Sequence, residues 1–183
     1  MTEVHVVLGR DLAGEDLQLI NYHRKLEFNS QHTIVPSHNN DDWDKPYFLV
    51  RSSGKLVAFG RLHNIEVEFS GVRYEILGIA TVIAIVKHTG FGQLLMSEMK
   101  RYIRQSGKTA IGFCDPKVSG FYEKCGFSIL RDGKSRFLFI DHGKAVPPPH
   151  PRDYALYLDG QDQLMDAVSS NPREVVTAYR KTW

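Results

Sequence analysis

The feature that most constrains this chain is a glycine-containing turn between a strand-like run and a helix-like run. Apolar, mostly β-branched residues lead up to Val86, and an amphipathic pattern starts directly after the turn. The turn itself consists of Lys87, His88, Thr89, Gly90, Phe91 and Gly92. Glycines let backbone N–H groups approach an anion, and the first amides of a helix carry partial positive charge. The order strand, glycine turn, helix therefore predicts a phosphate-binding loop.

A second helix start lies downstream of this loop. Asp115 and Pro116 are typical of a helix N-cap followed by the first helical position. The next turn and a half carries Phe121 and Tyr122, and Gly126 is expected to end the helix. The two motifs together are more specific than a glycine pair alone, which often does no more than turn the chain.

The sequences KHTGFG and YEKCGF resemble the two signature motifs of the GNAT superfamily of N-acetyltransferases. The loop of that family has Gln or Arg, two residues, Gly, one residue, then Gly or Ala, and its later helix ends in a run like Tyr-x-Lys-x-Gly-Phe. Lys87 stands where Gln or Arg is usual, which keeps a donor but loses the planar bidentate geometry. The resemblance covers a core from about Tyr47 to Leu130.

The resemblance implies an α/β (α+β) fold of the GNAT type. Its mixed central sheet would have about six to seven strands, with splayed parallel central strands flanked by helices. Residues 1–141 would form the acetyltransferase core, and residues 142–183 a Pro-rich connection with a strand and helix extension of the same domain.

Hydrophobic periodicity and turn signals predict the elements along the chain. The expected strands are Val4–Leu8, Tyr47–Ser52, Leu56–Phe69, Val72–Val86, Thr109–Cys114, Phe127–Leu130, Arg136–Ile140 and Tyr154–Leu158. The expected helices are Gly14–Asn29, Gly92–Arg104, the short one after Asp115, Leu164–Val168 and Glu174–Tyr179. Because a helix separates them, the fourth and fifth strands should be parallel.

The resemblance implies acetyl-CoA as co-substrate, with no metal. The residues expected to bind it are Ala80, Thr81, Val82, Lys87, His88, Thr89, Gly90, Phe91, Gly92, Asp115 and Ser119. The backbone N–H of Val82 would polarise the thioester carbonyl, and Tyr122 would be the general acid that protonates the leaving sulfur. Two alternatives stay open: Tyr122 as an ordinary core residue, and Asp115 as a helix cap.

No single catalytic base can be assigned from the sequence. Many members of the family carry a carboxylate on the central strand shortly before the loop, and Glu75 is the nearest candidate here. Its alternative role is structural: Arg73 would form a cross-strand ion pair with Glu75 and with Glu66 or Glu68. His63 is a second candidate, although a lone histidine on a strand is more often structural, and a water chain is a third route.

Charge and composition limit the kinds of partner and the location that the sequence predicts. The net charge of +2 gives no global field for nucleic acid. Residues 87–124 hold seven basic and three acidic residues, an excess of +4 that is either a solvated helix face or attracts a polyanionic cofactor. No apolar stretch has the length of a signal peptide core or a membrane span, so a cytoplasmic location is expected, with Cys114 and Cys125 packed in the core. The oligomeric state stays open, a homodimer included.

The acceptor is expected to meet the segment before the second strand. The polar and aromatic residues of this segment would attract a cationic amine, or would form a solvated loop in which one Asp caps a helix. They are Asn39, Asn40, Asp41, Asp42, Trp43, Asp44 and Tyr47. The predicted function is N-acetyltransfer from acetyl-CoA to a primary amine of a small molecule or peptide. The alternatives are a non-catalytic acyl-CoA-binding sensor or scaffold, and a nucleotide-binding protein, which the missing Lys-Ser/Thr pair after Gly92 disfavours.

Overall fold

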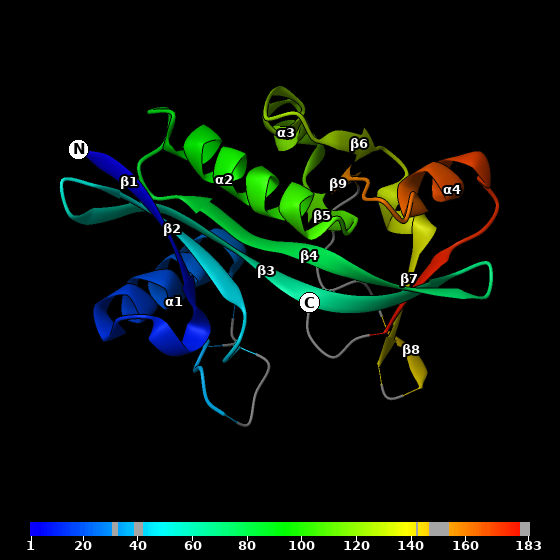
Figure 1. Ribbon diagram of the computed structural model, residues 1–183, viewed down its shortest axis with the longest axis horizontal. Helices are drawn as coiled ribbons and strands as arrows, with labels where there is room; N and C mark the ends of the chain where they lie inside the picture. Colours follow the sequence, from blue (N-terminus) through cyan, green and yellow to red (C-terminus); the bar gives the residue numbers. More distant parts are fainter. Residues whose placement is uncertain (31–32, 39–41, 142, 147–153, 180–183) are drawn as a thin grey trace. The chain divides into compact units, whose positions relative to one another are not determined.

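The computed structural model describes residues 1–30, 33–38, 42–141, 143–146 and 154–179 (Figure 1). Two compact units divide the chain, and each is built from separate segments. The first unit comprises Met1–His63 and Ala80–Met99. The second comprises Asn64–Ile79 and the chain from Lys100 onward.

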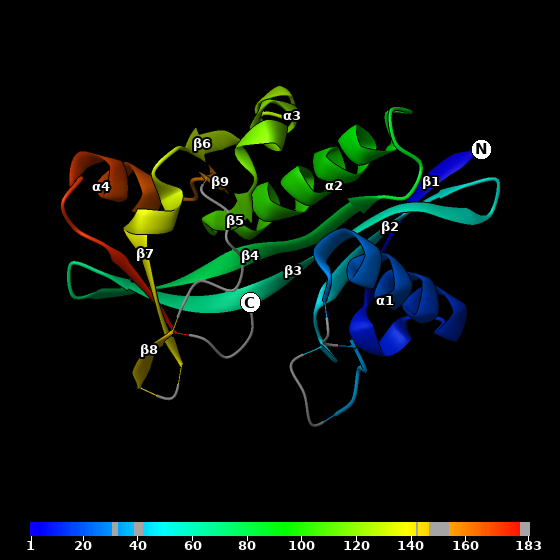
Figure 2. The same cartoon turned by 180° about the vertical axis from the view of Figure 1, so that it is seen from behind.

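The first unit places a helix on each face of a few strands. Its elements are β1 (Thr2–Leu8), the 3₁₀ turn η1 (Gly9–Asp11), α1 (Gly14–Phe28), β2 (Pro46–Ser52), the first part of β3 (Lys55–Phe69), the last part of β4 (Val72–Ala84) and most of α2 (Phe91–Ser106). β1 pairs antiparallel with β2, and β2 with β3. In Figure 2, α1 lies in front of β2 and β3, whereas in Figure 1 it lies behind them.

Alternation along β3 decides which side chains each helix covers. A Cβ on Gly60 would meet the side chains of Met99 and Leu95, so this face of β3 packs against α2. Phe59 points to the other face, where it is fully buried in one cluster with Ile20 of α1. Because successive strand residues face opposite sides, Arg61 lies on the same face as Phe59, the face covered by α1.

The second unit is dominated by a sheet. Its elements, besides the remaining parts of β3, β4 and α2, are β5 (Ala110–Cys114), η2 (Pro116–Val118), α3 (Ser119–Lys124), β6 (Ser128–Leu130), η3 (Gly133–Arg136), β7 (Phe137–Asp141), β8 (Lys144–Val146), β9 (Tyr154–Leu158), α4 (Leu164–Ser170) and β10 (Val176–Tyr179). The strand order is β6-β9-β5-β4-β3-β10-β7-β8. β5 runs parallel to β4, as expected from the helix between them.

Most predicted elements are confirmed, but the C-terminal segment is not helical. Residues from Glu174 were predicted as a short helix, whereas Val176–Tyr179 form β10, parallel to β7 and antiparallel to β3. The run Val175-Val176-Thr177 is β-branched and fits a pleated surface better than a helix. With β8 and β10, the sheet has ten strands among the described residues, more than the number predicted.

The chain after residue 141 contributes inner strands of the second unit. β9 lies between β5 and β6, and β10 between β3 and β7. Their side chains join a core cluster that includes Val67, Phe139 and Val176. The boundary predicted at residue 141 stays a prediction, but β9 and β10 beyond it are each paired on both edges. Among the described residues, the structure contains no helix long and apolar enough to cross a membrane.

Candidate functional site

The predicted phosphate loop is an exposed turn that opens α2 in the first unit. Its conformation is left-handed at His88 (φ 62°) and at Gly90 (φ 86°). Thr89 closes the turn, because its hydroxyl donates to the carbonyl of Val86 at 3.0 Å. The carbonyl of Gly90 accepts the first helical hydrogen bond, from the N–H of Leu94 at 3.0 Å. The amides of the first turn after Gly90 therefore have no partner within the helix, as a phosphate site requires.

Glycine at position 90 has a specific reason. A side chain at this φ is strained, although no atom lies within 4 Å of the place where a Cβ would be. The space beside the backbone is thus open, and a ligand can approach the amides closely. Lys87, the residue that departs from the usual motif, forms an ion pair with Glu27 of α1 at 2.7 Å. The Lys87 side chain is about half exposed.

The strand before the loop is irregular near its end. The ladder between β4 and β5 pairs Leu77–Ile79 with Ala110–Gly112, but β4 continues to Ala84. Thr81 has a φ of 58°, which is uncommon for a β-branched residue and interrupts the regular pleat. Ala80, Thr81 and Val82 are half-buried. They lie where β4 extends beyond its ladder with β5, the place predicted for the binding edge.

The other predicted site residues lie in the second unit. Asp115 caps the helix start, since its carboxylate accepts from the N–H of Lys117 at 2.8 Å, which confirms the capping alternative. The hydroxyl of Ser119 donates to the carbonyl of Pro116 at 2.9 Å. Tyr122 on α3 is 8 % exposed. Its predicted approach to the thioester stays a prediction.

The candidate bases differ in their surroundings. Arg73 pairs with Glu66 at 2.8 Å and with Glu68 at 3.7 Å, which confirms the predicted cross-strand ion pairs. Glu75 does not share them, because its carboxylate instead accepts from Lys108 at 3.0 Å and is largely exposed. This pairing favours a structural role for Glu75, and its role as base stays a prediction.

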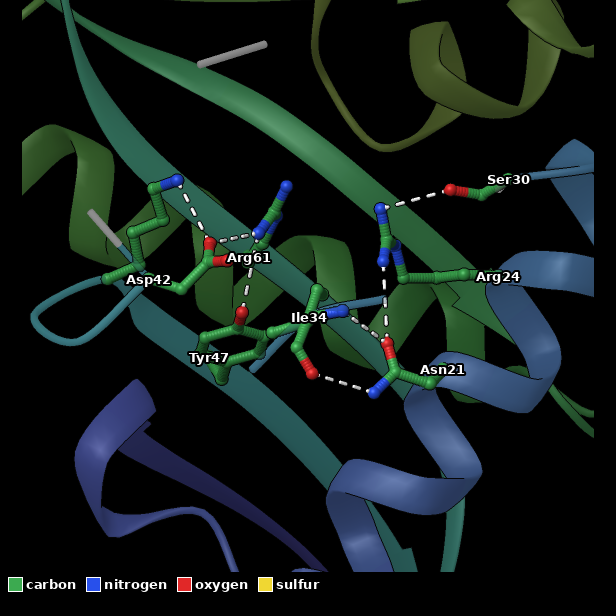
Figure 3. A network of polar contacts seen from close by, with 8 residues as sticks. Asn21, Arg24, Ser30, Ile34, Asp42, Tyr47 and Arg61 are labelled. Carbon is green, nitrogen blue, oxygen red and sulfur yellow. Dashed lines mark hydrogen bonds and ion pairs between the residues drawn. The ribbon is translucent and has the colours of Figure 1, made fainter. Parts of the chain in front are cut away.

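The segment predicted as an acidic wall contains a buried ion cluster instead. Asn39, Asn40 and Asp41 lie outside the described residues. Asp42 is 7 % exposed, and its carboxylate accepts from Lys45 at 3.0 Å and from Arg61 at 2.7 Å (Figure 3). Asp42 therefore neutralises cations of its own chain and is not available to attract a cationic amine. Asp44 is exposed and forms an ion pair with Arg10.

The backbone of η1 holds this cluster in place. The N–H of Gly9 donates to the carbonyl of Lys45 and that of Arg10 to the carbonyl of Trp43, both at 2.9 Å. A Cβ on Gly9 would overlap the carbonyl of Asp42, so only glycine allows this approach. The sequence offered a signal that was missed: Arg61 is a charged residue within the otherwise apolar run from Leu56 to Leu62 of β3.

The pKa values within the cluster follow from burial and neighbouring charge. Burial alone would raise the pKa of Asp42, but the charges of Arg61 and Lys45 and their hydrogen bonds outweigh it and lower that pKa. Burial also lowers the pKa of Arg24 on α1, and the charge of Arg61 lowers it further. His63, 2 % exposed on β3, has a pKa well below its usual value because of burial and the charges of Arg61 and Lys45. Its ring is therefore neutral at pH 7.

This shift at His63 predicts an acid-sensitive fold. A histidine whose pKa is lower in the folded than in the unfolded state binds its proton preferentially after unfolding. Stability contributed by the neutral ring is therefore complete above about pH 6.5, and is lost as the pH falls below the unfolded value. We expect the free energy of unfolding to decline there by up to about 1.4 kcal/mol per pH unit. Urea unfolding of wild type and His63→Gln at several pH values measures this slope.

The control for that measurement is His5→Gln, which alters an exposed histidine on β1. We expect His63→Gln to flatten the slope and His5→Gln to leave it unchanged. Equal slopes for wild type and His63→Gln would contradict the assignment.

The two cysteines are core residues. Cys114 and Cys125 are both buried and not disulfide-bonded, which confirms their prediction as core residues. Burial raises the pKa of the Cys125 thiol, and the charge of Lys100 offsets this in part. A raised pKa disfavours the thiolate form that a nucleophile would need.

Comparisons with known proteins agree with this arrangement. The sequence model of the Acetyltransferase (GNAT) family matches residues 17–127. No curated protein sequence matches the chain. Escherichia coli ElaA is similar in structure, with a TM-score of 0.60 and 18% identity, over 87% of this chain and 100% of ElaA.

Two more solved structures share the fold. An acyl-CoA N-acyltransferase from Pseudomonas aeruginosa has a TM-score of 0.56 and 13% identity, covering 86% of this chain and 99% of its own. The Bacillus subtilis N-acetyltransferase YlbP, solved in complex with coenzyme A, has a TM-score of 0.51 and 16% identity, covering 87% of this chain and 97% of YlbP. At these identities the likeness establishes the fold alone.

Proposed function

Because the chain belongs to the acetyltransferase (GNAT) family, we propose that it transfers the acetyl group of acetyl-CoA to a primary amine of a small molecule or peptide. The observation that carries this proposal is the left-handed turn at Gly90, which opens α2 directly after the irregular end of β4. The amides after Gly90 bind the diphosphate of coenzyme A. The backbone of Ala80, Thr81 and Val82 binds the pantetheine arm in the manner of an added strand.

The reaction proceeds by direct attack in a ternary complex. The neutral amine attacks the thioester carbon, a C–N bond forms, and the C–S bond breaks. The N–H of Val82 stabilises the negative charge that develops on the carbonyl oxygen. Tyr122 gives its phenolic proton to the leaving sulfur. The proton of the attacking nitrogen leaves to water or to a carboxylate, for which Glu75 is the candidate on β4.

The loop is tested by a glycine substitution with a matched control. In Gly90→Ala, the left-handed conformation costs about 1–2 kcal/mol and the loop relaxes away from it. We expect the dissociation constant for acetyl-CoA, measured by calorimetry, to rise about tenfold or more. The control is Gly71→Ala, because Gly71 in the turn after β3 has a similar φ of 76° and equally open surroundings.

Gly71→Ala should lower stability by a similar amount and leave acetyl-CoA binding unchanged. Equal affinities for both variants would show that the Gly90 turn is not the binding site. Absence of binding to acetyl-CoA and to coenzyme A in the wild-type protein would overturn the proposed function as a whole.

A second candidate is a non-catalytic acyl-CoA-binding sensor or scaffold. It is favoured by the absence of a carboxylate among residues 79–84 of β4, together with the engagement of Glu75 by Lys108. Release of free coenzyme A in the presence of a panel of primary amines separates the two functions. Binding without amine-dependent release would favour the sensor.

A further inference from the structure

Arg61 is a buried guanidinium with an unused edge. Its side chain is 8 % exposed. Its Nη1 donates to Asp42 at 2.7 Å and to the hydroxyl of Tyr47 at 3.4 Å. The buried Nε has no hydrogen-bond partner, and Nη2 makes no hydrogen bond within the part of the chain that the structure describes. Such an orphaned donor is costly in a protein interior, where polar groups are ordinarily satisfied. The Nε–Nη2 edge is also the one that binds a carboxylate with two parallel hydrogen bonds.

The surroundings of this edge are cationic. Arg24 on α1 belongs to a second set of polar contacts, in which its guanidinium contacts Asn21 and Ser30 at 3.5 and 3.4 Å (Figure 3). Burial lowers the pKa of Arg24 most, the charge of Arg61 lowers it further, and Tyr47 and Asp42 offset part of this, so the two guanidinium groups repel each other. An anion bound at the free edge of Arg61 would relieve this repulsion.

The strand that carries Arg61 also pairs with the strand that carries the predicted acyl-binding residues. β3 and β4 are joined by the turn at Ser70 and Gly71, and the N–H of Ile85 donates to the carbonyl of Val57 at 2.9 Å. Arg61 lies on β3 four residues after Val57, and Thr81 lies on β4 four residues before Ile85. Arg61 and the predicted acyl-binding residues of β4 therefore lie on neighbouring strands of the same unit.

We propose that the free edge of Arg61, together with Arg24, binds a carboxylate of the acceptor, so that the acceptor is an amino acid or a small amino-acid-like compound. This inference rests on the proposed function and names its substrate class. It replaces the cationic acceptor expected from the acidic segment, because the charge presented by the described cluster is positive.

Matched acceptor pairs test the proposal without any mutation. The twenty L-amino acids are compared with their carboxamides, which keep the amine and side chain but lack the negative charge. We expect kcat/KM for the best amino acid to exceed that of its carboxamide by at least tenfold, because a charged hydrogen-bonded pair contributes about 1.5–3 kcal/mol. Ethanolamine and its O-phosphate form a further pair, and preference for the phosphate over every carboxylate would overturn the proposal.

A conservative variant tests the residue. Arg61→Lys keeps the positive charge beside Asp42 but removes the planar edge. We expect it to raise KM for the preferred amino acid about tenfold and to abolish the preference over the carboxamide. The control is Arg51→Lys. Arg51 lies on β2, forms an ion pair with Asp16 and has no part in the cluster. It should retain the preference.

Calorimetry provides a readout apart from turnover. N-acetyl amino acids, the expected products, should bind to wild type and to Gly90→Ala alike, and about tenfold more weakly to Arg61→Lys. If Arg61→Lys does not fold, the carboxylate and carboxamide comparison on the wild type decides the proposal. Binding of acetyl-CoA and acetylation of amines without a carboxylate preference would overturn this inference and leave the proposed function standing. Absence of acetyl-CoA binding would instead overturn the proposed function.

Discussion

The Tyr122→Phe variant is expected to bind acetyl-CoA as tightly as wild type and to turn over at least tenfold more slowly. The phenol is the predicted acid for the leaving thiolate, and general acid catalysis contributes about 10²–10⁴-fold. The substitution removes one oxygen and keeps the ring, which packs edge-on against Phe121 with centroids 5.1 Å apart. Stability should therefore change little. Steady-state release of coenzyme A, combined with calorimetry of acetyl-CoA binding, measures the two effects separately.

A tyrosine away from the proposed chemistry serves as the control for this variant. Tyr22 lies on α1 and is 59% exposed, so Tyr22→Phe removes the same atom from a solvated position. It should leave both binding and turnover unchanged. If Tyr122→Phe also turned over at the wild-type rate, the phenol would not be the proton donor, and another acid or water would have to protonate the sulfur.

The parts of the fold that could be predicted from sequence have local signals. α2 was predicted from the spacing of Leu95, Met99, Tyr102 and Ile103, of which Tyr102 is half-buried and the other three are buried as expected. Gly107 ends that helix in the left-handed conformation. The turn at Gly90 and the helix start after it were predicted equally well, because the order of an apolar run, glycines and a helix start is contained within a few residues; phosphate binding there stays a prediction. Each of these signals depends only on neighbours in the chain.

The parts that were mistaken or missed depend on partners far away in the sequence. β10 is a strand because β3 and β7 offer it two edges, and a window of a few residues does not contain that information. The bond between Asp42 and Arg61 likewise joins residues that are 19 positions apart. A buried arginine within the apolar run of β3 requires a partner, but the sequence alone does not say which acidic residue supplies it.

The catalytic base could not be predicted for the same reason. Glu75 was selected because it is the nearest carboxylate upstream of the loop, yet its contact is with Lys108, 33 positions away. Proximity along a strand therefore predicted the existence of an ion pair near Glu75 but not its partner. The identity of a base depends on which atoms face the bound amine, and this is set by tertiary packing.

The Asp42→Asn variant is expected to lose about 3–5 kcal/mol of unfolding free energy, the range found when one partner of a buried ion pair is removed. The neutral amide leaves the ammonium of Lys45 and the guanidinium of Arg61 buried without the charge that compensates them. Urea unfolding at pH 7 measures the loss. The lowered pKa of Asp42 means that its contribution is present above the ordinary carboxyl pKa and is lost as the pH falls through the lower folded value. The wild-type and variant stabilities should therefore converge in strong acid.

Asp44→Asn is the matched control, since it makes the same substitution two residues further on, in an exposed ion pair with Arg10. Exposed pairs contribute about 0–1 kcal/mol, so this variant should remain close to wild type. A loss of equal size in the two variants would mean that Asp42 is solvated in solution. The free edge of Arg61 would then be solvated as well, and the argument for a carboxylate-binding cluster would lose its premise.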